Sequence, residues 1–179
     1  MSQQKFSLRP FSEEKGSRPV AIDGVIARQS AALTLEYRLK GHLAAVAIPD
    51  WAPAPLRLDG LWRETCFECF VARHDSPHYW EFNISPAGHW NVYRFAAYRQ
   101  GMTEETAFQS LPCTRSTEAG LLSLALHIDL AKILDGERRI EIAVSAVIQY
   151  KNADLDYWAL THADAAPDFH RRECFAIRL

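Results

Sequence analysis

Tryptophan, glutamate, asparagine and arginine side chains gather between Leu61 and Phe95, in the segments LWRETCFECFV and YWEFNISPAGHWNVYRF. Flat aromatic rings can stack on a ligand, while carboxylate, amide and guanidinium groups hydrogen-bond to it. The candidate aromatic plates are Trp62, Trp90 and Trp158, and the candidate hydrogen-bonding residues are Glu64, Glu68, Asn83, Asn91 and Arg94. This combination of aromatic and hydrogen-bonding residues favours a site for a non-covalent ligand. The alternative for each residue is a purely structural role, because tryptophan is highly buried on average.

Glu68 lies between Phe67 and Cys69 in an otherwise apolar segment. A buried carboxylate without a partner costs several kcal/mol, so an arginine, a backbone N–H group or a ligand has to satisfy it. The candidate partners are Arg63, Arg94 and Arg99. Both structural pairing and ligand contact stay open.

The segments Tyr79–Ile84 and His89–Phe95 are expected to form a hairpin closed by the Ser85–Gly88 turn. Because side chains alternate along a strand, the residues of each segment can be assigned to one of its two faces. Glu81 and Asn83 share one face of the first strand, and Trp90 and Arg94 share one face of the second. We expect these two faces to lie side by side where the register allows it. The alternative is that Trp90 is core and Arg94 pairs with a carboxylate.

Cys66 and Cys69 form a CxxC pattern, but residues three apart on a strand face opposite sides. No second CxxC completes a four-thiolate zinc site, so packing is the expected role. Seven histidines lack HExxH spacing. His162, a further candidate ligand contact, shares a loop with His170, Asp164 and Asp168, which favours either a hydrogen-bonded surface loop or a metal site.

Signals for catalysis are weak. Ser145 has no GxSxG context, and Glu64 with Glu81 is an unsupported carboxylate pair for glycoside hydrolysis. The sequence has no phosphate-binding glycine loop. We therefore lean toward a non-catalytic protein, although an enzyme acting on a sugar derivative stays open.

The 179 residues fit one domain spanning the whole chain. The net charge of −2, from 20 basic and 22 acidic residues, gives no electrostatic reason to expect nucleic acid or an anionic membrane as a partner. The polar start lacks a signal-peptide pattern, and no apolar run approaches the length of a membrane span. We expect a cytoplasmic protein with reduced cysteines.

Short alternating segments predict an all-β antiparallel sandwich, of jelly-roll or immunoglobulin-like type, with nine to eleven strands and one short helix over Leu130–Leu134 capped by Asp129. Besides the hairpin, strands are expected near Phe6 and over Val20–Arg28 (interrupted at Asp23–Gly24), Ala31–Lys40, Leu43–Ile48, Leu61–Val71, Leu121–Ile128, Ile140–Tyr150, Tyr157–Thr161 and Cys174–Leu179. Loops are expected over Met1–Pro19 after the edge strand and over Pro49–Gly60, and Tyr98–Gly120 is a connection with at most one exposed strand.

The sequence resembles the DOMON-like domains related to family 9 carbohydrate-binding modules. The resemblance rests on Trp62 with Glu64 and Phe67–Phe70, on Tyr79–Gly88 followed by Trp90–Tyr93, and on Ile142–Ile148, Tyr157–His162 and Pro167–His170, which resemble the bacterial branch. It implies a β-sandwich with a groove for a non-covalent ligand. Relatives bind sugars, and some bind haem.

On this resemblance we expect non-catalytic binding of a carbohydrate or sugar-like small molecule, because sugar rings present flat C–H faces with a rim of hydroxyl groups. Such contacts predict affinities on the order of micromolar to millimolar. No cofactor is expected. The alternatives are a haem-binding domain, with histidine paired to histidine or to Met102, and a protein-interaction module. The oligomeric state stays open.

Overall fold

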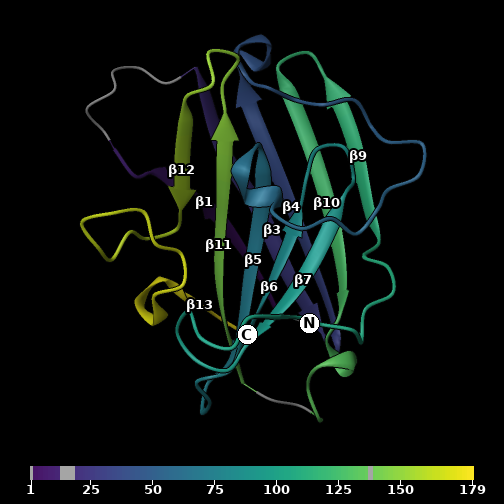
Figure 1. Ribbon diagram of the computed structural model, residues 1–179, viewed down its shortest axis with the longest axis vertical. Coiled ribbons are helices and arrows are strands. Elements are labelled where there is room, and N and C mark those ends of the chain that lie inside the picture. Colours follow the sequence, from purple (N-terminus) through teal and green to yellow (C-terminus); the bar gives the residue numbers. More distant parts are fainter. Residues whose placement is uncertain (1, 13–18, 137–138) are drawn as a thin grey trace.

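Two antiparallel sheets pack face to face in the computed structural model, which describes residues 2–12, 19–136 and 139–179 (Figure 1). Every pairing between named strands is antiparallel, and the longest helical element within these ranges is a single 3₁₀ turn. The predicted all-β antiparallel sandwich is therefore confirmed. No helix in the described residues is long and apolar enough to cross a membrane.

The smaller sheet has the strand order β1-β3-β4-β10-β9. Its strands are β1 (Ser2–Ser7), β3 (Val20–Gln29), β4 (Ala32–Gly41), β9 (Cys113–Glu118) and β10 (Leu121–Asp129). In β4 and β10 every second side chain is buried, as in Leu33, Leu35, Tyr37 and Leu39. This alternation gives the sheet one apolar face toward the core and one face toward solvent.

The larger sheet has the order β2-β12-β11-β5-β6-β7-β8, with β13 paired to one end of β11. Its strands are β2 (Arg9–Pro10), β5 (Cys66–Arg73), β6 (Tyr79–Ile84), β7 (Trp90–Phe95), β8 (Thr103–Glu104), β11 (Ile140–Gln149), β12 (Leu155–Ala159) and β13 (Ile177–Arg178). In β6 all six side chains are buried. The centre of this sheet is therefore covered on both faces.

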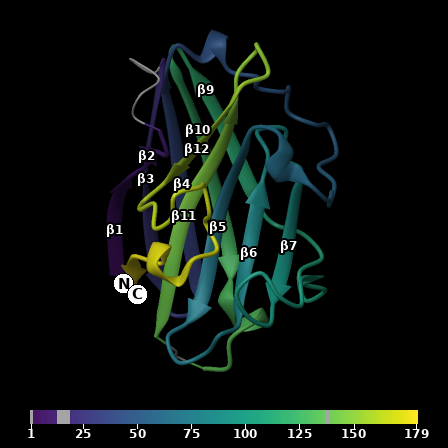
Figure 2. The same cartoon turned by 60° about the vertical axis from the view of Figure 1, so that its left-hand side comes forward.

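Two apolar clusters account for that burial. One fills the space between the sheets, where Phe67, Phe82 and Val144 meet residues of β3, β4 and β10. The other lies on the outer face of the larger sheet, where Phe169 and Phe175 of the C-terminal segment pack on that sheet. Figures 1 and 2 show this yellow segment running over β11 and β12. The C-terminal segment therefore forms a thin third layer over part of the larger sheet.

Four 3₁₀ turns connect the strands: η1 (Leu43–Ala45), η2 (Leu61–Arg63), η3 (Leu130–Lys132) and η4 (Arg172–Cys174). The predicted short helix is η3. The Asp129 side chain caps it by accepting a hydrogen bond from the Ala131 N–H at 3.1 Å.

The expected interruption at Asp23–Gly24 is wrong, because β3 runs through it. Gly24 stands opposite Phe6 on one side and Tyr37 on the other. A Cβ at this position would lie 2.0 Å from the Glu36 carbonyl oxygen and 2.4 Å from the Phe6 ring. The glycine therefore serves close packing within a strand instead of a turn.

Three further expectations differ from the structure. Leu43–Ile48 is a 3₁₀ turn followed by an isolated bridge at Val46, so its apolar run reflects partial burial instead of a full strand. Leu61–Val71 begins with η2, and β5 starts only at Cys66. The connection 98–120 holds two strands, β8 and β9, because edge strands can be polar and still pair. The described residues contain thirteen strands, several only two residues long. The predicted loop at residues 13–18 lies outside the described residues.

Gly24→Ala should lower the free energy of unfolding by about 1–3 kcal/mol, because the new methyl group meets a backbone oxygen that cannot move without opening β3 from β4. Urea denaturation of both proteins measures the difference. Ala21→Val, at an exposed position of the same strand, should change stability by less than about 0.5 kcal/mol. Equal stability of Gly24→Ala and the wild type would show that the strand spacing is not as described.

Candidate binding site on the outer face of the large sheet

A row of four polar side chains crosses four neighbouring strands. Ser145 of β11 stands opposite Glu68 of β5, Glu68 opposite Asn83 of β6, and Asn83 opposite Asn91 of β7. Opposed residues of antiparallel strands point to the same face, here the outer one shared with Val147. Glu68 and Asn83 are 2% and 0% exposed. Their polar atoms therefore need partners that bulk water does not supply.

A second carboxyl group lies beside this row. Glu81 stands opposite Phe70 and Tyr93, one step along the same face from Asn83. The Asn83 Nδ2 group donates to Glu81 Oε1 at 2.8 Å. The Asn83 Oδ1 atom is buried and has no hydrogen-bond partner among the described residues. One buried acceptor thus stays open next to two buried carboxyl groups.

Burial shifts both carboxyl groups toward the neutral form. It raises the pKa of Glu68 well above the usual value, and the neighbouring Glu81 raises it further. The Ser145 hydroxyl donates to Glu68 Oε2 at 3.2 Å, which opposes that shift only in part. Burial also raises the pKa of Glu81, to about 7, against the opposing effects of Asn83 and Arg99. Near neutral pH the pair therefore holds a proton that it can give up.

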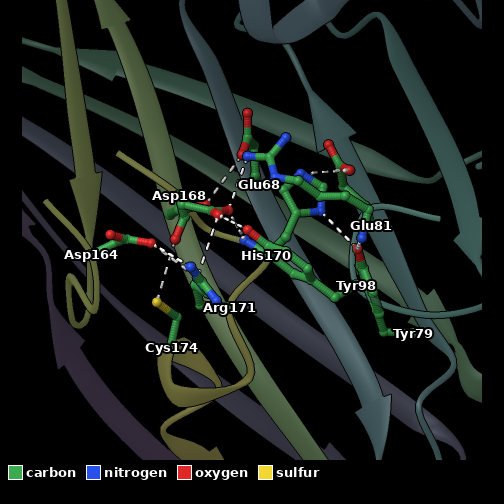
Figure 3. A network of polar contacts seen from close by, with 11 residues as sticks. Glu68, Tyr79, Glu81, Tyr98, Asp164, Asp168, His170, Arg171 and Cys174 are labelled. Carbon is green, nitrogen blue, oxygen red and sulfur yellow. Dashed lines mark hydrogen bonds and ion pairs between the residues drawn. The ribbon is translucent and has the colours of Figure 1, made fainter. Parts of the chain in front are cut away.

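His170 of the C-terminal segment faces Glu81, and Figure 3 shows it between Glu81 and Tyr79. The Tyr79 oxygen accepts the Arg99 backbone N–H at 3.2 Å and lies 2.9 Å from His170 Nδ1. Burial raises the pKa of Tyr79 to about 12, so this hydroxyl keeps its proton and donates it to Nδ1. Neutral His170 then carries its proton on Nε2, 4.0 Å from Glu81 Oε2.

Ion pairs fix the segment that carries His170. Asp168 accepts from Arg99 Nη2 at 2.9 Å and from the Tyr98 hydroxyl at 2.5 Å, and also receives the His170 backbone N–H at 3.0 Å. Arg171 binds Asp164 at 2.6 Å, as Figure 3 also shows. Asp164 and Asp168, which the sequence left open between a hydrogen-bonded loop and a metal site, are thus paired with arginines. Within the described residues no group of three or more His, Cys, Asp or Glu side chains is arranged so that it could hold a metal ion.

A cavity of about 310 Å³ opens above the two carboxyl groups. Its floor contains Glu68, Glu81 and Val147 of the sheet, and its walls combine aromatic rings with loop residues. The wall residues are Trp62, Phe95, Arg99, Met102, Tyr157, Pro167, Phe169 and His170. A second hollow, of about 570 Å³, is lined by Tyr79, Tyr98 and Arg172 and shares His170 with the first. The smaller cavity is the one that joins aromatic surfaces to buried polar groups.

Two of the sequence-predicted residues, Trp62 and Glu68, line this cavity, and Asn83 lies directly beside its floor. Trp62 follows the left-handed Gly60, whose φ of +74° precedes η2. Its ring packs edge-on against Tyr93 with centroids 5.6 Å apart. Glu64, only two residues further along, is exposed and is not among the lining residues.

The other predicted residues lie elsewhere. Trp90 and Trp158 are buried in the core between the sheets, where the Arg57 guanidinium stacks on Trp90 at 4.4 Å. Arg94 shares the strand face of Trp90 but is exposed at its end. His162 contacts the Arg9 carbonyl oxygen through Nε2 at 2.9 Å.

The expected neighbourhood of Glu81 and Asn83 with Trp90 and Arg94 is wrong. The register pairs Glu81 with Tyr93 and Asn83 with Asn91, so the polar face meets the odd-numbered residues of β7. A shift of one residue exchanges the two faces of a strand, and the turn decides which one occurs. Gly88, at φ +88°, closes this turn by donating its N–H to the Ser85 carbonyl oxygen at 2.9 Å.

The sequence suggested Arg63, Arg94 and Arg99 as partners of Glu68. In the structure the Glu68 carboxyl group instead accepts a hydrogen bond from the Ser145 hydroxyl. Tyr157, Phe169 and Arg99 were not singled out as ligand contacts, and Met102 was named only as the methionine of the haem alternative. Of these residues only Tyr157 could have been found from side-chain alternation, because it lies in a strand and stands opposite Val147 on the outer face. The others come from loops, where no side-chain period exists. Cys66 and Cys69 are buried free thiols on opposite faces of β5, as expected from a strand.

Comparison with known proteins adds a structural likeness. No family model and no curated protein sequence matches the chain. A solved structure of a candidate carbohydrate-binding protein from Bacteroides uniformis ATCC 8492 matches with a TM-score of 0.72 at 14% identity, over 96% of this chain and 83% of that one.

Two solved structures of a family 9 carbohydrate-binding module from Caldicellulosiruptor kristjanssonii, in complex with glucose and with cellotriose, match less well. Their TM-scores are 0.48 and 0.45, at 11% and 9% identity, over 82% of this chain and 69% and 68% of theirs. The fold is therefore the one seen in the Bacteroides protein.

The buried Glu81 carboxyl should make stability depend on pH. Its pKa is raised from 4.5 to about 7 on folding, so the native state binds the proton more tightly than the unfolded state. The resulting stabilisation is full below about pH 4.5 and is lost as pH rises to about 7, an effect on the order of 3 kcal/mol. Urea denaturation across this range measures it, and Glu81→Gln should show a flatter profile. Parallel profiles for the two proteins would contradict the assignment.

Proposed function

We propose that this protein binds a carbohydrate or a sugar-like small molecule in the cavity on the outer face of the large sheet, without catalysis. The observation that carries the proposal is the meeting of two buried carboxyl groups, Glu68 and Glu81, with the aromatic rings of Trp62, Tyr157 and Phe169 around one space of about 310 Å³. That volume is at the lower end of small-molecule sites, roughly 300–1,000 Å³, and suits one sugar unit.

The aromatic walls supply surfaces on which the C–H face of a sugar ring can stack. Trp62 is the most suitable plate, because its contact with Tyr93 holds the indole in place before a ligand arrives. The carboxyl groups at the floor offer both acceptor oxygens and, when protonated, a donor. Arg99 and His170 reach the cavity from the loops and add donors at its side.

The likeness to the Bacteroides protein, itself described as a candidate carbohydrate-binding protein, supports this proposal through the shared fold. The motifs around Trp62 and Tyr79–Gly88 support membership of the DOMON-like group, which we also propose. A cytoplasmic location is part of the same proposal. In this setting the ligand is a soluble sugar or metabolite.

Trp62→Ala should weaken sugar binding by roughly 5- to 30-fold, because one stacking surface is worth about 1–2 kcal/mol. Thermal-shift screening against mono- and oligosaccharides first identifies a ligand, and isothermal titration calorimetry then compares the proteins. Trp51→Ala is the matched control, since Trp51 is 38% exposed and does not line the cavity. Equal losses in both variants, or none in either, would contradict the assignment of the cavity.

Haem is the second candidate, favoured by one observation. Met102 and His170 line the same cavity, and in the other neutral tautomer of His170 the Nδ1–H group donates to the Tyr79 oxygen and leaves Nε2 without a proton. These two side chains would supply a methionine–histidine pair of axial ligands, and bound haem would supply one-electron chemistry. The small volume and the buried carboxyl groups fit a porphyrin less well than a sugar.

Titration of the protein with haemin, followed by visible absorption, tests this alternative. Specific binding should give a sharp Soret band that is displaced in both Met102→Ala and His170→Ala. Cys113→Ser, outside the cavity, should leave the spectrum unchanged. A haemin spectrum identical in all four proteins would remove haem from consideration.

A further inference from the structure

The two carboxyl groups at the cavity floor are not paired with a cationic side chain in the described part of the chain. Glu68 contacts the Ser145 hydroxyl, and Glu81 contacts the Asn83 amide. A buried carboxylate normally has a cation or several hydrogen-bond donors beside it, because desolvation otherwise costs several kcal/mol. The site therefore lacks a positive charge beside these carboxyl groups, and a bound ligand can supply it.

Neighbouring basic groups do not fill this role. Arg99 acts on Glu81 through space, but its guanidinium is bound to Asp168 at 2.9 Å and half of its side chain is exposed. His170 lies 4.0 Å from Glu81, yet burial and the charge of Arg99 lower its pKa to about 4. It is neutral at physiological pH, so its contact with Glu81 is not an ion pair.

The remaining walls suit a positive charge. Four aromatic rings, those of Trp62, Phe95, Tyr157 and Phe169, surround the space above the carboxyl groups. The negative face of an aromatic ring attracts a cation, by about 0.5–2 kcal/mol depending on desolvation. Aromatic rings combined with carboxylates form the kind of site that recognises ammonium groups.

The hydrogen-bonding pattern of the floor agrees with this. Ionised Glu68 and Glu81 are acceptors only, and the buried Asn83 Oδ1 is an acceptor without a partner among the described residues. An ammonium group offers three donors and no acceptor. A neutral sugar hydroxyl brings both, and does not compensate a negative charge.

We propose that the cavity selects a ligand carrying a protonated amine, such as an amino sugar, whose ammonium group binds between Glu68 and Glu81. This inference rests on the proposed function and deepens it by naming the ligand class. Binding of the ammonium group favours the ionised form of the Glu68 and Glu81 carboxyl groups, so the proton that this pair holds is released to solvent. The titratable and charged groups facing Glu81 are Glu68 and Cys66 of β5, Tyr79 of β6, Tyr93 of β7, Arg99 after β7 and His170 of the C-terminal segment.

Calorimetric titration of the full chain with glucosamine, glucose and N-acetylglucosamine near neutral pH tests the inference. Glucosamine should bind at least roughly tenfold more tightly than the two neutral sugars, as expected for one charge-assisted hydrogen bond. Repeating the glucosamine titration in two buffers of different ionisation enthalpy should reveal net proton release. The comparison uses the wild-type protein, so it does not depend on a variant that folds.

Glu81→Gln should remove the preference for glucosamine over glucose, because the amide keeps the shape of the carboxyl group and loses its charge. Glu64→Gln, exposed and outside the cavity, is the matched control and should behave as the wild type. Methylammonium, which has no sugar ring, serves as a second probe.

Equal affinity for glucosamine and glucose would overturn the inference and leave sugar binding intact. Binding of N-acetylglucosamine as tight as that of glucosamine would also overturn it, because the acetylated nitrogen carries no charge. Binding of methylammonium without binding of any sugar would support the ammonium site and overturn the carbohydrate proposal. Absence of binding by all four probes would overturn both.

Discussion

The burial of the large sheet on both faces is the constraint on which the rest of the structure depends. Its inner face meets the small sheet, and its outer face is covered by the C-terminal segment and by Trp62. In an ordinary sandwich the outward side chains of a central strand are hydrated. Here Glu68, Glu81 and Asn83 point outward but are at most 4% exposed, so their charges and hydrogen bonds have to be satisfied within the site.

Two polar contacts and apolar packing hold the covering segment on the sheet. Arg172 binds Glu141 of β11 at 2.6 Å, and Asp168 binds Arg99 after β7. Phe169, between these two anchors, and Phe175, three residues after Arg172, pack on the sheet. The same segment therefore completes the outer core and supplies a wall of the cavity, so stability and ligand binding share residues.

The cavity keeps polar groups that a stable core would not select. A carboxyl pair and an unpartnered amide oxygen lower stability, and hydrophobic residues of similar size would pack at least as well. Local choices that conflict with stability are expected at functional sites. The position of His170 is a second such choice. Tyr79, itself bound by the Arg99 backbone N–H, holds a neutral imidazole facing the Glu81 carboxyl group, and the imidazole does not neutralise that group's charge.

The sequence by itself determined the fold class, most of the long strands, the hairpin and the cap at Asp129, because these follow from local alternation and turn chemistry. It also singled out Trp62, Glu68 and Asn83. Only the tertiary structure decided that Trp90 and Trp158 are core, that Glu81 shares a face with Tyr93, and that Phe169 and His170 close the cavity. Register between strands and the position of a loop over a sheet depend on contacts between distant segments, and no short-range pattern encodes them.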